Sequence, residues 1–393
     1  MGLLRLGKKS RSRETKRRDA PSGSLQLRLE DLHDFARGAA VLGTGGGGDP
    51  YIGRLMAQAA IKEYGTPQII SLNELDDDAQ VAFIAMLGAP TVLNEKAASG
   101  DDIELALTRL SERIGRKIDA LMPAEIGGVN STIPIVAAAR LGLPLLNADG
   151  MGRAFPEIQM VTMNFEGVSA TPFVIVDEHG NSTIVETDTA KRAEEFVRVL
   201  AMQMGLSCMV AGYPMTGAEA KRATVPDTLT EALEIGRAIK QGREAGDPVA
   251  ALVDRLTSSS IYGFGVELFD GKITDLRRET TRGFSIGYCE IEALNDPSEK
   301  LEIQFQNEFL IAQKSGVVLA SVPDLISLVD RETAEPITVE SLRYGQRVRV
   351  VAAAAPRALR TPQALSAISP QCFGLDHDYQ PIEHLHPNSN RTS

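Results

Sequence analysis

The arrangement of apolar segments changes at about residue 261, and this change constrains the fold more than any other feature of the sequence. Before it, segments with helical spacing alternate with short apolar strands, an order that favours an α/β layer. After it, short strand-like segments follow one another with turns between them. We therefore predict an N-terminal α/β domain with a mixed or parallel sheet, followed by a β-rich C-terminal domain. The predicted divisions are a disordered basic tail and linker at 1–28, the α/β domain at 29–188, a helical bridge at 189–260, the β-rich domain at 261–381 and a tail at 382–393.

Local apolar periodicity predicts the individual elements. The helices are expected at 29–42, 51–64, 104–114, 131–141, 190–204 and 227–241. The first strands are expected at 68–72, 80–87, 120–123 and 144–146, and in a hairpin at 173–176 and 182–186. Those of the C-terminal domain are expected at 262–269, 282–294, 300–306, 309–312, 317–322 and 347–353. Because ligands gather at the carboxyl ends of strands in α/β sheets, function is expected between Gly43 and Glu157.

Charge is distributed unevenly along the chain. The net charge is −11, yet the first 19 residues hold eight Lys or Arg against only Glu14 and Asp19. A basic arm without interleaved aromatic residues, attached to an acidic body, favours a disordered tail, so we expect no nucleic-acid partner.

No apolar run approaches the roughly 20 residues of a membrane span, so no membrane role is expected. The first residues lack the apolar segment of a secretory signal. Cys208, Cys289 and Cys372 are odd in number and far apart, which argues against a disulfide framework. We therefore expect a cytoplasmic protein.

The segment GTGGGGDP, Gly43 to Pro50, is the first that carries chemistry. Consecutive glycines allow positive φ angles and let backbone amides approach a ligand, and the helix that follows directs its positive end at the same place. Asp49 is a catalytic candidate. The glycines expected to bind substrate are Gly45, Gly46, Gly47 and Gly48.

Other interpretations of this glycine loop stay open. It is either a functional loop or a flexible turn between two helices. Gly43, Gly45 and Gly48 satisfy GxGxxG, but a dinucleotide site also needs a preceding strand and an acidic ribose ligand, which are missing. A P-loop needs Lys and Ser or Thr where Asp49 and Pro50 stand.

Two further polar loops follow predicted strands. In the loop 122–132, Glu125 is a candidate base or metal ligand and Asn130 a candidate substrate ligand. In the loop 147–157, Asp149 and Arg153 lie close in sequence. Carboxylates and a guanidinium at neighbouring strand ends form either a site or a surface ion-pair network. We expect Asp149 first and Glu125 second to be catalytic, and Arg153 to bind substrate.

Histidines are too few and too scattered to define a metal site. The chain has five, and His384 and His386 lie in the polar tail, where solvent exposure is expected. His33, in the helix before the glycine loop, is either exposed or a ligand. The ligands of any metal therefore stay unknown.

Six motifs together resemble the S-methyl thiohydantoin desulfurase family, and the resemblance covers about residues 29–381. The glycine loop and the DGMGR motif are specific in combination. The six are GAAVLGTGGGGDPYIG at 38–53, PAEIGGVN at 123–130, DGMGRAFPEIQM at 149–160, FQNEFLIA at 305–312, PDLI at 323–326 and FGLDHDY at 373–379.

The resemblance implies a hydrolase that removes sulfur from C2 of a thiohydantoin or related cyclic ureide, assisted by a divalent metal such as zinc. It also implies a small-molecule substrate and either a homo-oligomer or a hydantoinase-type partner subunit. The first alternative is a non-catalytic or nucleotide-binding accessory subunit of a hydantoinase or oxoprolinase-like system. A second is a sensor without turnover.

Overall fold

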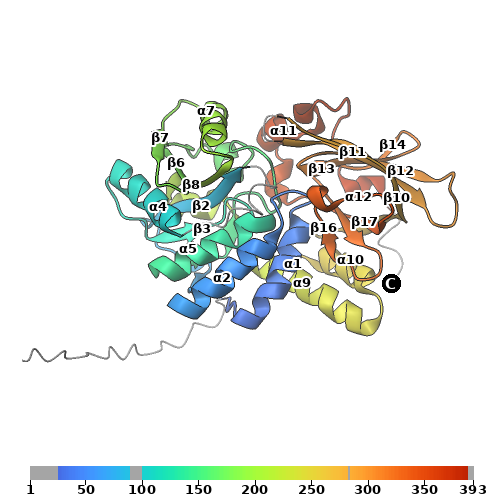
Figure 1. The fold of residues 1–393 in the computed structure, drawn as a ribbon, viewed down its shortest axis with the longest axis horizontal. Coiled ribbons are helices and arrows are strands. Elements are labelled where there is room, and N and C mark those ends of the chain that lie inside the picture. The colour runs from blue at the N-terminus through green and yellow to red at the C-terminus, as the bar shows by residue number, and fades with distance from the viewer. Residues whose placement is uncertain (1–24, 89–99, 282–283, 388–393) are drawn as a thin grey trace, which may run out of the picture.

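The computed structural model describes residues 25–88, 100–281 and 284–387, in which two large sheets are joined by helices (Figure 1). Most of the predicted basic tail therefore lies outside the described residues. Its last part is already packed, because Leu27 is buried in the core. None of the helices in the described residues is both long and apolar enough to cross a membrane.

The first sheet belongs to the N-terminal α/β domain and is mixed, as predicted. β1, β4, β3 and β2 are parallel neighbours, while β8, β6 and β7 continue the sheet with antiparallel pairing. The strands are β1 (Ile69–Ile70), β2 (Gln80–Gly88), β3 (Ala120–Met122), β4 (Leu145–Leu146), β6 (Phe173–Asp177), β7 (Ser182–Val185) and β8 (Ser207–Thr216).

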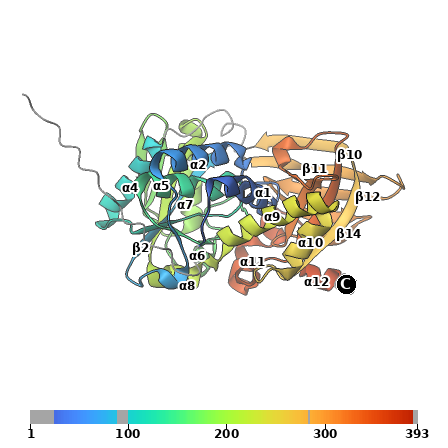
Figure 2. The same ribbon diagram turned by 90° about the horizontal axis from the view of Figure 1, so that it is seen from below.

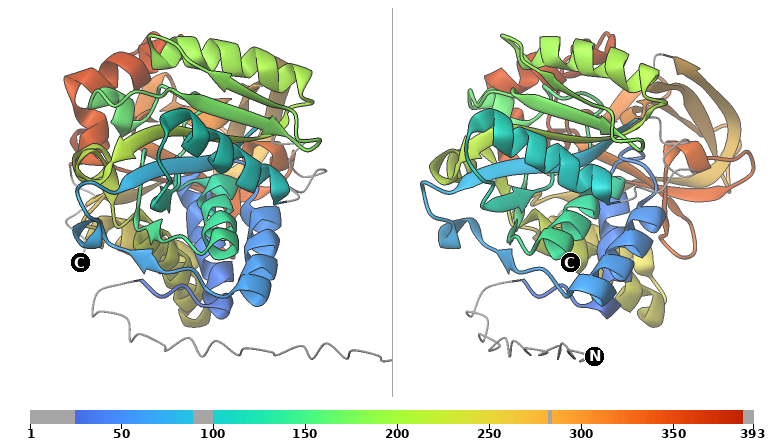
Figure 3. Two further views of the ribbon diagram at one scale, coloured as in Figure 1. Left: turned by 90° about the vertical axis from the view of Figure 1, so that its left-hand side faces the viewer. Right: turned by 60° about the vertical axis from the view of Figure 1, so that its left-hand side comes forward.

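Helices cover both faces of this sheet (Figure 3). Side chains alternate along a strand, so Ala82 and Ile84 of β2 face α4 and α5, whereas Phe83 and Ala85 face α7. The helices in this part are α1 (Leu32–Leu42), α2 (Pro50–Tyr64), α4 (Asp101–Ile114), α5 (Ile133–Leu141), α6 (Thr162–Phe165), α7 (Ala190–Gln203) and α8 (Gly217–Ala223). A small separate sheet pairs β5 (Ala148–Asp149) with β9 (Val225–Pro226).

The segment 189–260 is more than the predicted helical bridge. It contains α7, α9 (Thr228–Ala245) and α10 (Pro248–Ser258), but β8 within it pairs with both β2 and β6 inside the first sheet. The run Cys208–Ala211 is apolar and buried without alternation, the pattern of an interior strand. Periodicity alone does not separate such a run from a buried helix.

The second sheet forms the β-rich C-terminal domain, as predicted, and is antiparallel throughout, in the order β14-β13-β12-β11-β10-β17-β15-β16. β15 and β16 have no counterpart among the predicted strands. Residues 282–283 of one predicted strand lie outside the described residues. The strands are β10 (Gly265–Thr281), β11 (Phe284–Ala293), β12 (Lys300–Gln306), β13 (Glu308–Lys314), β14 (Val317–Ser321), β15 (Leu325–Asp330), β16 (Pro336–Ile337) and β17 (Arg347–Ala353).

The chain ends with α11 (Pro362–Ile368) and α12 (Ile382–Leu385), so residues 382–387 are not the loose tail that the sequence predicts. Ile382 is fully buried, and a ring nitrogen of His386 lies 2.8 Å from the carbonyl oxygen of Leu319. Ile382 is one apolar residue in a polar segment, which is why its burial leaves no periodic signal.

Helices α1 and α9 cross so closely that their backbones touch (Figure 2). A Cβ on Gly38 would lie 1.7 Å from the carbonyl oxygen of Ala232, and one on Gly236 would lie 1.7 Å from that of Asp34. α10, which follows α9, packs on β10 and β17. This packing places the end of α1, where the glycine loop begins, at the boundary between the two sheets.

Candidate active site

The glycine loop is held by backbone hydrogen bonds from three separate segments. Its carbonyl oxygens at Thr44, Gly45 and Gly47 accept hydrogen bonds from the amides of Phe309 (2.7 Å), Val339 (2.8 Å) and Val129 (2.9 Å). Two of these donors belong to the C-terminal domain. The loop is therefore an ordered part of the boundary and not a flexible turn.

Two glycines of the loop are required by close contacts with β13. A Cβ on Gly45, whose φ is +90°, would lie 2.5 Å from the ring of Phe309. A Cβ on Gly46 would lie 2.0 Å from Oε1 of Glu308. Glycine at these positions thus makes room for the start of β13 beside the loop.

Gly47 and Gly48 line a cavity of about 120 Å³ between the loop, the α7-facing side of the first sheet and the segment 151–161. Both have a positive φ, +71° and +76°. The polar side chains Glu125, Asn130 and Glu308 line the same cavity. The structure therefore brings the predicted Glu125 and Asn130 together with part of the glycine loop.

Asn130 positions Glu125. Its Oδ1 accepts the amide hydrogen of Met86 at 2.8 Å, and its Nδ2 donates to the carbonyl oxygen of Met86 at 3.1 Å and to Oε1 of Glu125 at 2.8 Å. One oxygen of Glu125 is thereby tied to the end of β2. The other, Oε2, is buried and has no hydrogen-bond partner among the described residues.

Glu308 was not among the predicted site residues, although the motif FQNEFLIA contains it. It is the first residue of β13, is almost fully buried, and its Oε2 also has no hydrogen-bond partner in the described part of the chain. The signal was the polar pair Asn307 and Glu308 between two apolar strands. Such a pair also reads as an ordinary tight turn, and Asn307 does have a turn-like φ of +60°.

Burial makes the carboxyl groups of Glu125 and Glu308 weaker acids than glutamates in water. It raises the pKa of Glu125 to about 8. Burial, and then the neighbouring charge of Glu125, raises the pKa of Glu308 well above its usual range. Two carboxyls that hinder each other's ionisation form a pair in which one gives up its proton before the other. Such a pair can act as general base and general acid together.

Arg153 lies beneath the glycine loop and not in the lining of the cavity. Its Nη2 donates to Oγ1 of Thr44 at 2.7 Å, and its Nη1 donates to the carbonyl oxygens of Pro323 (2.8 Å) and Asp324 (2.9 Å). Burial lowers its pKa to about 10, opposed by the charge of Glu308. Arg153 therefore stays cationic at neutral pH and links the loop to the C-terminal domain.

Asp149 accepts hydrogen bonds from the backbone on both oxygens. Its Oδ2 accepts from the amides of Ile126 (2.8 Å), Met151 (3.1 Å) and Gly152 (2.9 Å), and its Oδ1 from Gly152 at 2.9 Å. Burial raises its pKa to about 7, although these hydrogen bonds oppose the shift. The side chain is absent from the cavity lining and joins the loop of Glu125 to the loop of Arg153.

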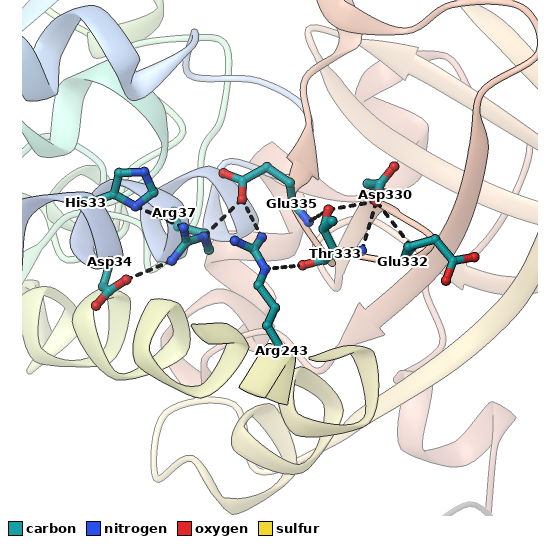
Figure 4. Close-up of polar contacts among 8 residues, drawn as sticks. All are labelled: His33, Asp34, Arg37, Arg243, Asp330, Glu332, Thr333 and Glu335. Atoms are coloured by element: carbon teal, nitrogen blue, oxygen red, sulfur yellow. Dashed lines mark hydrogen bonds and ion pairs between the residues drawn. The ribbon is translucent and has the colours of Figure 1, made fainter. Parts of the chain in front are cut away.

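Asp49 and His33 lie in a second cavity, outside the first. Asp49 caps α2 by accepting the amide hydrogen of Tyr51 at 2.8 Å. Figure 4 shows His33 beside Arg37, whose Nη2 donates to Nδ1 of His33 at 2.9 Å and whose Nε donates to Glu335 at 3.1 Å. Burial and the nearby arginines lower the pKa of His33. These residues cap a helix and connect the domains at some distance from Glu125.

The described side chains do not fit a zinc site. Zinc in catalytic sites is held by three protein ligands, and no three His, Cys, Asp or Glu side chains in residues 25–88, 100–281 and 284–387 lie in a group that could hold a metal ion. Four glutamates line the first cavity. Of these, Glu125 and Glu308, which form its polar end, keep a buried oxygen without a partner among the described residues.

Comparison with known proteins gives a family and a fold. No match to the chain is found among curated proteins. A crystal structure of a protein from Chromobacterium violaceum is 25% identical, covers 90% of this chain and 98% of its own, and superposes with a TM-score of 0.75. The model of the S-Me-THD-like N-terminal domain matches residues 30–187, and that of the S-Me-THD-like C-terminal domain matches residues 187–382. The chain therefore belongs to the S-Me-THD-like family, the S-methyl thiohydantoin desulfurase family predicted from its motifs.

Proposed function

We propose that this protein hydrolyses the bond between sulfur and C2 of a thiohydantoin or a related cyclic ureide, with Glu125 and Glu308 as the acid–base pair. The observation that carries the proposal is the pair of buried Oε2 atoms without partners in the described residues, on two glutamates that line one cavity together with Gly47 and Gly48. Buried polar atoms are rarely left without a partner. Two such atoms on residues that line one cavity suit a ligand that supplies the missing hydrogen bonds.

The ring of a cyclic ureide has the matching groups. A protonated carboxyl group has one O–H donor and one acceptor oxygen. A ring N–H next to C2 pairs with the acceptor, and the sulfur or nitrogen at C2 accepts from the O–H. Because both carboxyls lose their protons reluctantly, the polar end of the cavity favours such a neutral ring.

The reaction consumes one water and releases one thiol. Glu125 as carboxylate takes a proton from water while the water oxygen bonds to C2. The tetrahedral intermediate then loses its C2–S bond, and Glu308 gives its proton to the departing sulfur. The hydroxyl proton then leaves the oxygen while the ring nitrogen gains a proton from solvent, which forms the C2 carbonyl and the N–H of the hydantoin. Transfer of the proton from Glu125 to Glu308 through solvent returns both carboxyls to their starting state. General acid–base catalysis of this kind typically contributes about 10²–10⁴-fold in rate.

The proposal is tested with an S-methyl thiohydantoin in water labelled with ¹⁸O. The expected products are methanethiol and a hydantoin that carries one ¹⁸O at C2, measured by a thiol reagent and by mass spectrometry. Glu231→Gln is the matched control variant. Glu231 is also a buried glutamate with a raised pKa and an oxygen without a partner in the described residues, but it lies outside the cavity.

Release of methanethiol by the Glu231→Gln variant and not by Glu125→Gln supports the assignment. Absence of thiol release by the wild-type protein would overturn it. Metal analysis of the same preparation tests the expectation of zinc independently. The accessory nucleotide-binding role predicts protection by nucleotide without turnover, but the described lining of the cavity offers a polyphosphate no unpaired basic side chain.

A further inference from the structure

Beyond its polar end, the cavity is lined by apolar side chains from the first sheet. Phe83 and Ala85 of β2, Phe173 of β6 and Val210 of β8 line it, and all four are buried. Phe83 and Phe173 meet edge to face with ring centroids 5.7 Å apart. This apolar wall lies on the α7-facing side of the sheet.

A second wall of the cavity is apolar as well and is held in place by α7. Phe155, Ile158 and Val161 contribute to it. The amide of Ile158 donates to Oε2 of Glu194 at 3.0 Å, and Nη2 of Arg198 donates to the carbonyl oxygen of Pro156 at 3.0 Å. The segment is therefore fixed by side chains of one helix.

The charged side chains of the cavity do not suit an anionic group. Arg198 is the one basic side chain in the lining of the described cavity, and its Nε donates to Oε1 of Glu194 at 2.8 Å. Its guanidinium also lies over the ring of Phe284, 4.5 Å from the centroid. The lining includes two further glutamates besides the catalytic pair, and each is paired with a basic side chain, Glu157 with Lys191 at 2.7 Å and Glu194 with Arg198. A carboxylate on the substrate would therefore meet no unpaired basic side chain in the described lining.

We propose that the ring substituent of the substrate is apolar and uncharged, and packs against Phe83, Phe173 and Val210 while the ring meets Glu125 and Glu308. This inference rests on the proposed function, which supplies the ring. It names the substrate class more closely as five-membered cyclic ureides with an alkyl or aryl group at C5. Val210 is a specificity-determining residue in this arrangement, because it contacts the substituent and not the reacting atoms.

The first test compares thiohydantoins that share the ring and differ at C5, with methyl, isobutyl, benzyl and carboxyethyl groups. An extra methylene in an apolar pocket is worth about 10–200-fold in specificity. We expect kcat/KM for the isobutyl and benzyl compounds to exceed that for the methyl compound about 10-fold or more, with the carboxyethyl compound poorest. Equal rates for all four, or preference for the carboxyethyl compound, would overturn the inference and leave the proposed function intact.

The second test uses Val210→Thr, which keeps the volume and adds a hydroxyl to the wall. We expect it to lower the kcat/KM ratio of isobutyl to methyl compound severalfold, mainly through KM. Val176→Thr is the matched control, because Val176 is equally buried but belongs to the core on the other face of the sheet. A ratio that changes equally in both variants would contradict a role for Val210 in specificity.

A third measurement does not depend on turnover. The corresponding hydantoins, which lack sulfur, are added to the wild-type protein and their binding is measured by calorimetry. Tighter binding of isobutyl and benzyl hydantoins than of the carboxyethyl one supports the inference even if no thiol is released. Failure of every apolar hydantoin to bind overturns it.

Discussion

Two pairs of buried carboxyls, Glu125 with Glu308 and Asp149 with Asp324, differ in what their oxygens contact. Burial raises the pKa in all four. Asp149 accepts backbone amides on both oxygens, and Asp324 accepts the amides of Ala355 (2.7 Å) and Ile382 (2.8 Å) and the hydroxyl of Tyr379 (2.9 Å). Glu125 and Glu308 each keep one buried oxygen without a partner in the described residues.

The comparison separates two uses of a buried acid. A carboxyl whose oxygens all accept protein hydrogen bonds joins segments of the chain, and its loss leaves buried amides unsatisfied. A carboxyl with a vacant oxygen in a cavity is available to a ligand. A raised pKa alone therefore does not locate the site, whereas the hydrogen-bond partners do. We accordingly place Glu125 before Asp149 as the catalytic base.

The largest expected effect is on turnover. Glu125→Gln and Glu308→Gln should each lower kcat about 10²–10⁴-fold, because amides of the same size neither accept nor give the required proton. Chemical denaturation should give both variants a free energy of unfolding no lower than that of the wild type. Full activity in both would remove the distinction between the two pairs.

The next effect is on stability. Asp149→Asn and Asp324→Asn should each lower the free energy of unfolding by about 1–3 kcal/mol, because the new NH₂ group faces buried N–H donors. The measurement is a urea titration followed by circular dichroism. Unchanged stability together with lost activity in Asp149→Asn would instead assign Asp149 to catalysis.

A smaller effect concerns the pH dependence of the rate. The base form of Glu125 is required, and its pKa is raised to about 8. After subtraction of the uncatalysed reaction, kcat/KM should increase about tenfold for each unit by which the pH rises towards 8, and it should be constant above pH 8. The residual activity of Glu125→Gln should lack this increase with pH. If the increase of kcat/KM with pH persists in the variant, another group is the base.

A further effect is the pH dependence of stability. A carboxyl whose pKa is higher in the folded than in the unfolded state stabilises the fold at low pH, and this contribution is lost as pH rises through the folded value. For Glu125 the window runs from the ordinary pKa of a glutamate, 4.5, to about 8. As the pH rises from 5 to 8, the melting temperature of Glu125→Gln should therefore increase relative to that of the wild type. A constant difference across this range would show that the pKa of Glu125 does not differ between the two states.

Much of the architecture follows from the sequence, because it depends on local patterns. The alternation before residue 261 and the short strands after it predict two sheets of the observed kinds. β8 was missed although its apolar run resembles that of β2, because periodicity alone does not separate a short apolar strand from a buried helix. Glu125 and Asn130 were predicted to lie near each other because both belong to the polar loop after a predicted strand, and both line the first cavity.

The rest of the site depends on contacts between distant segments. Glu308 reaches the cavity because Gly46 leaves room for it, and neither residue alone predicts this contact. Arg153 was expected at the substrate, but its hydrogen bonds to Thr44 and to the carbonyl oxygens at 323 and 324 lie beneath the loop. Sequence patterns describe which residue types occur near strand ends, but not which of their atoms remain without partners.

The hydrogen bonds that Phe309 and Val339 donate to the glycine loop have a consequence for the order in which the parts of the cavity are assembled. During synthesis the loop leaves the ribosome long before either donor has been made. Chains grow at about 5–20 residues per second, so Glu308 follows Glu125 after on the order of ten seconds or more. In that interval the cavity lacks Glu308. The protein therefore completes its site only when the C-terminal domain folds against the loop.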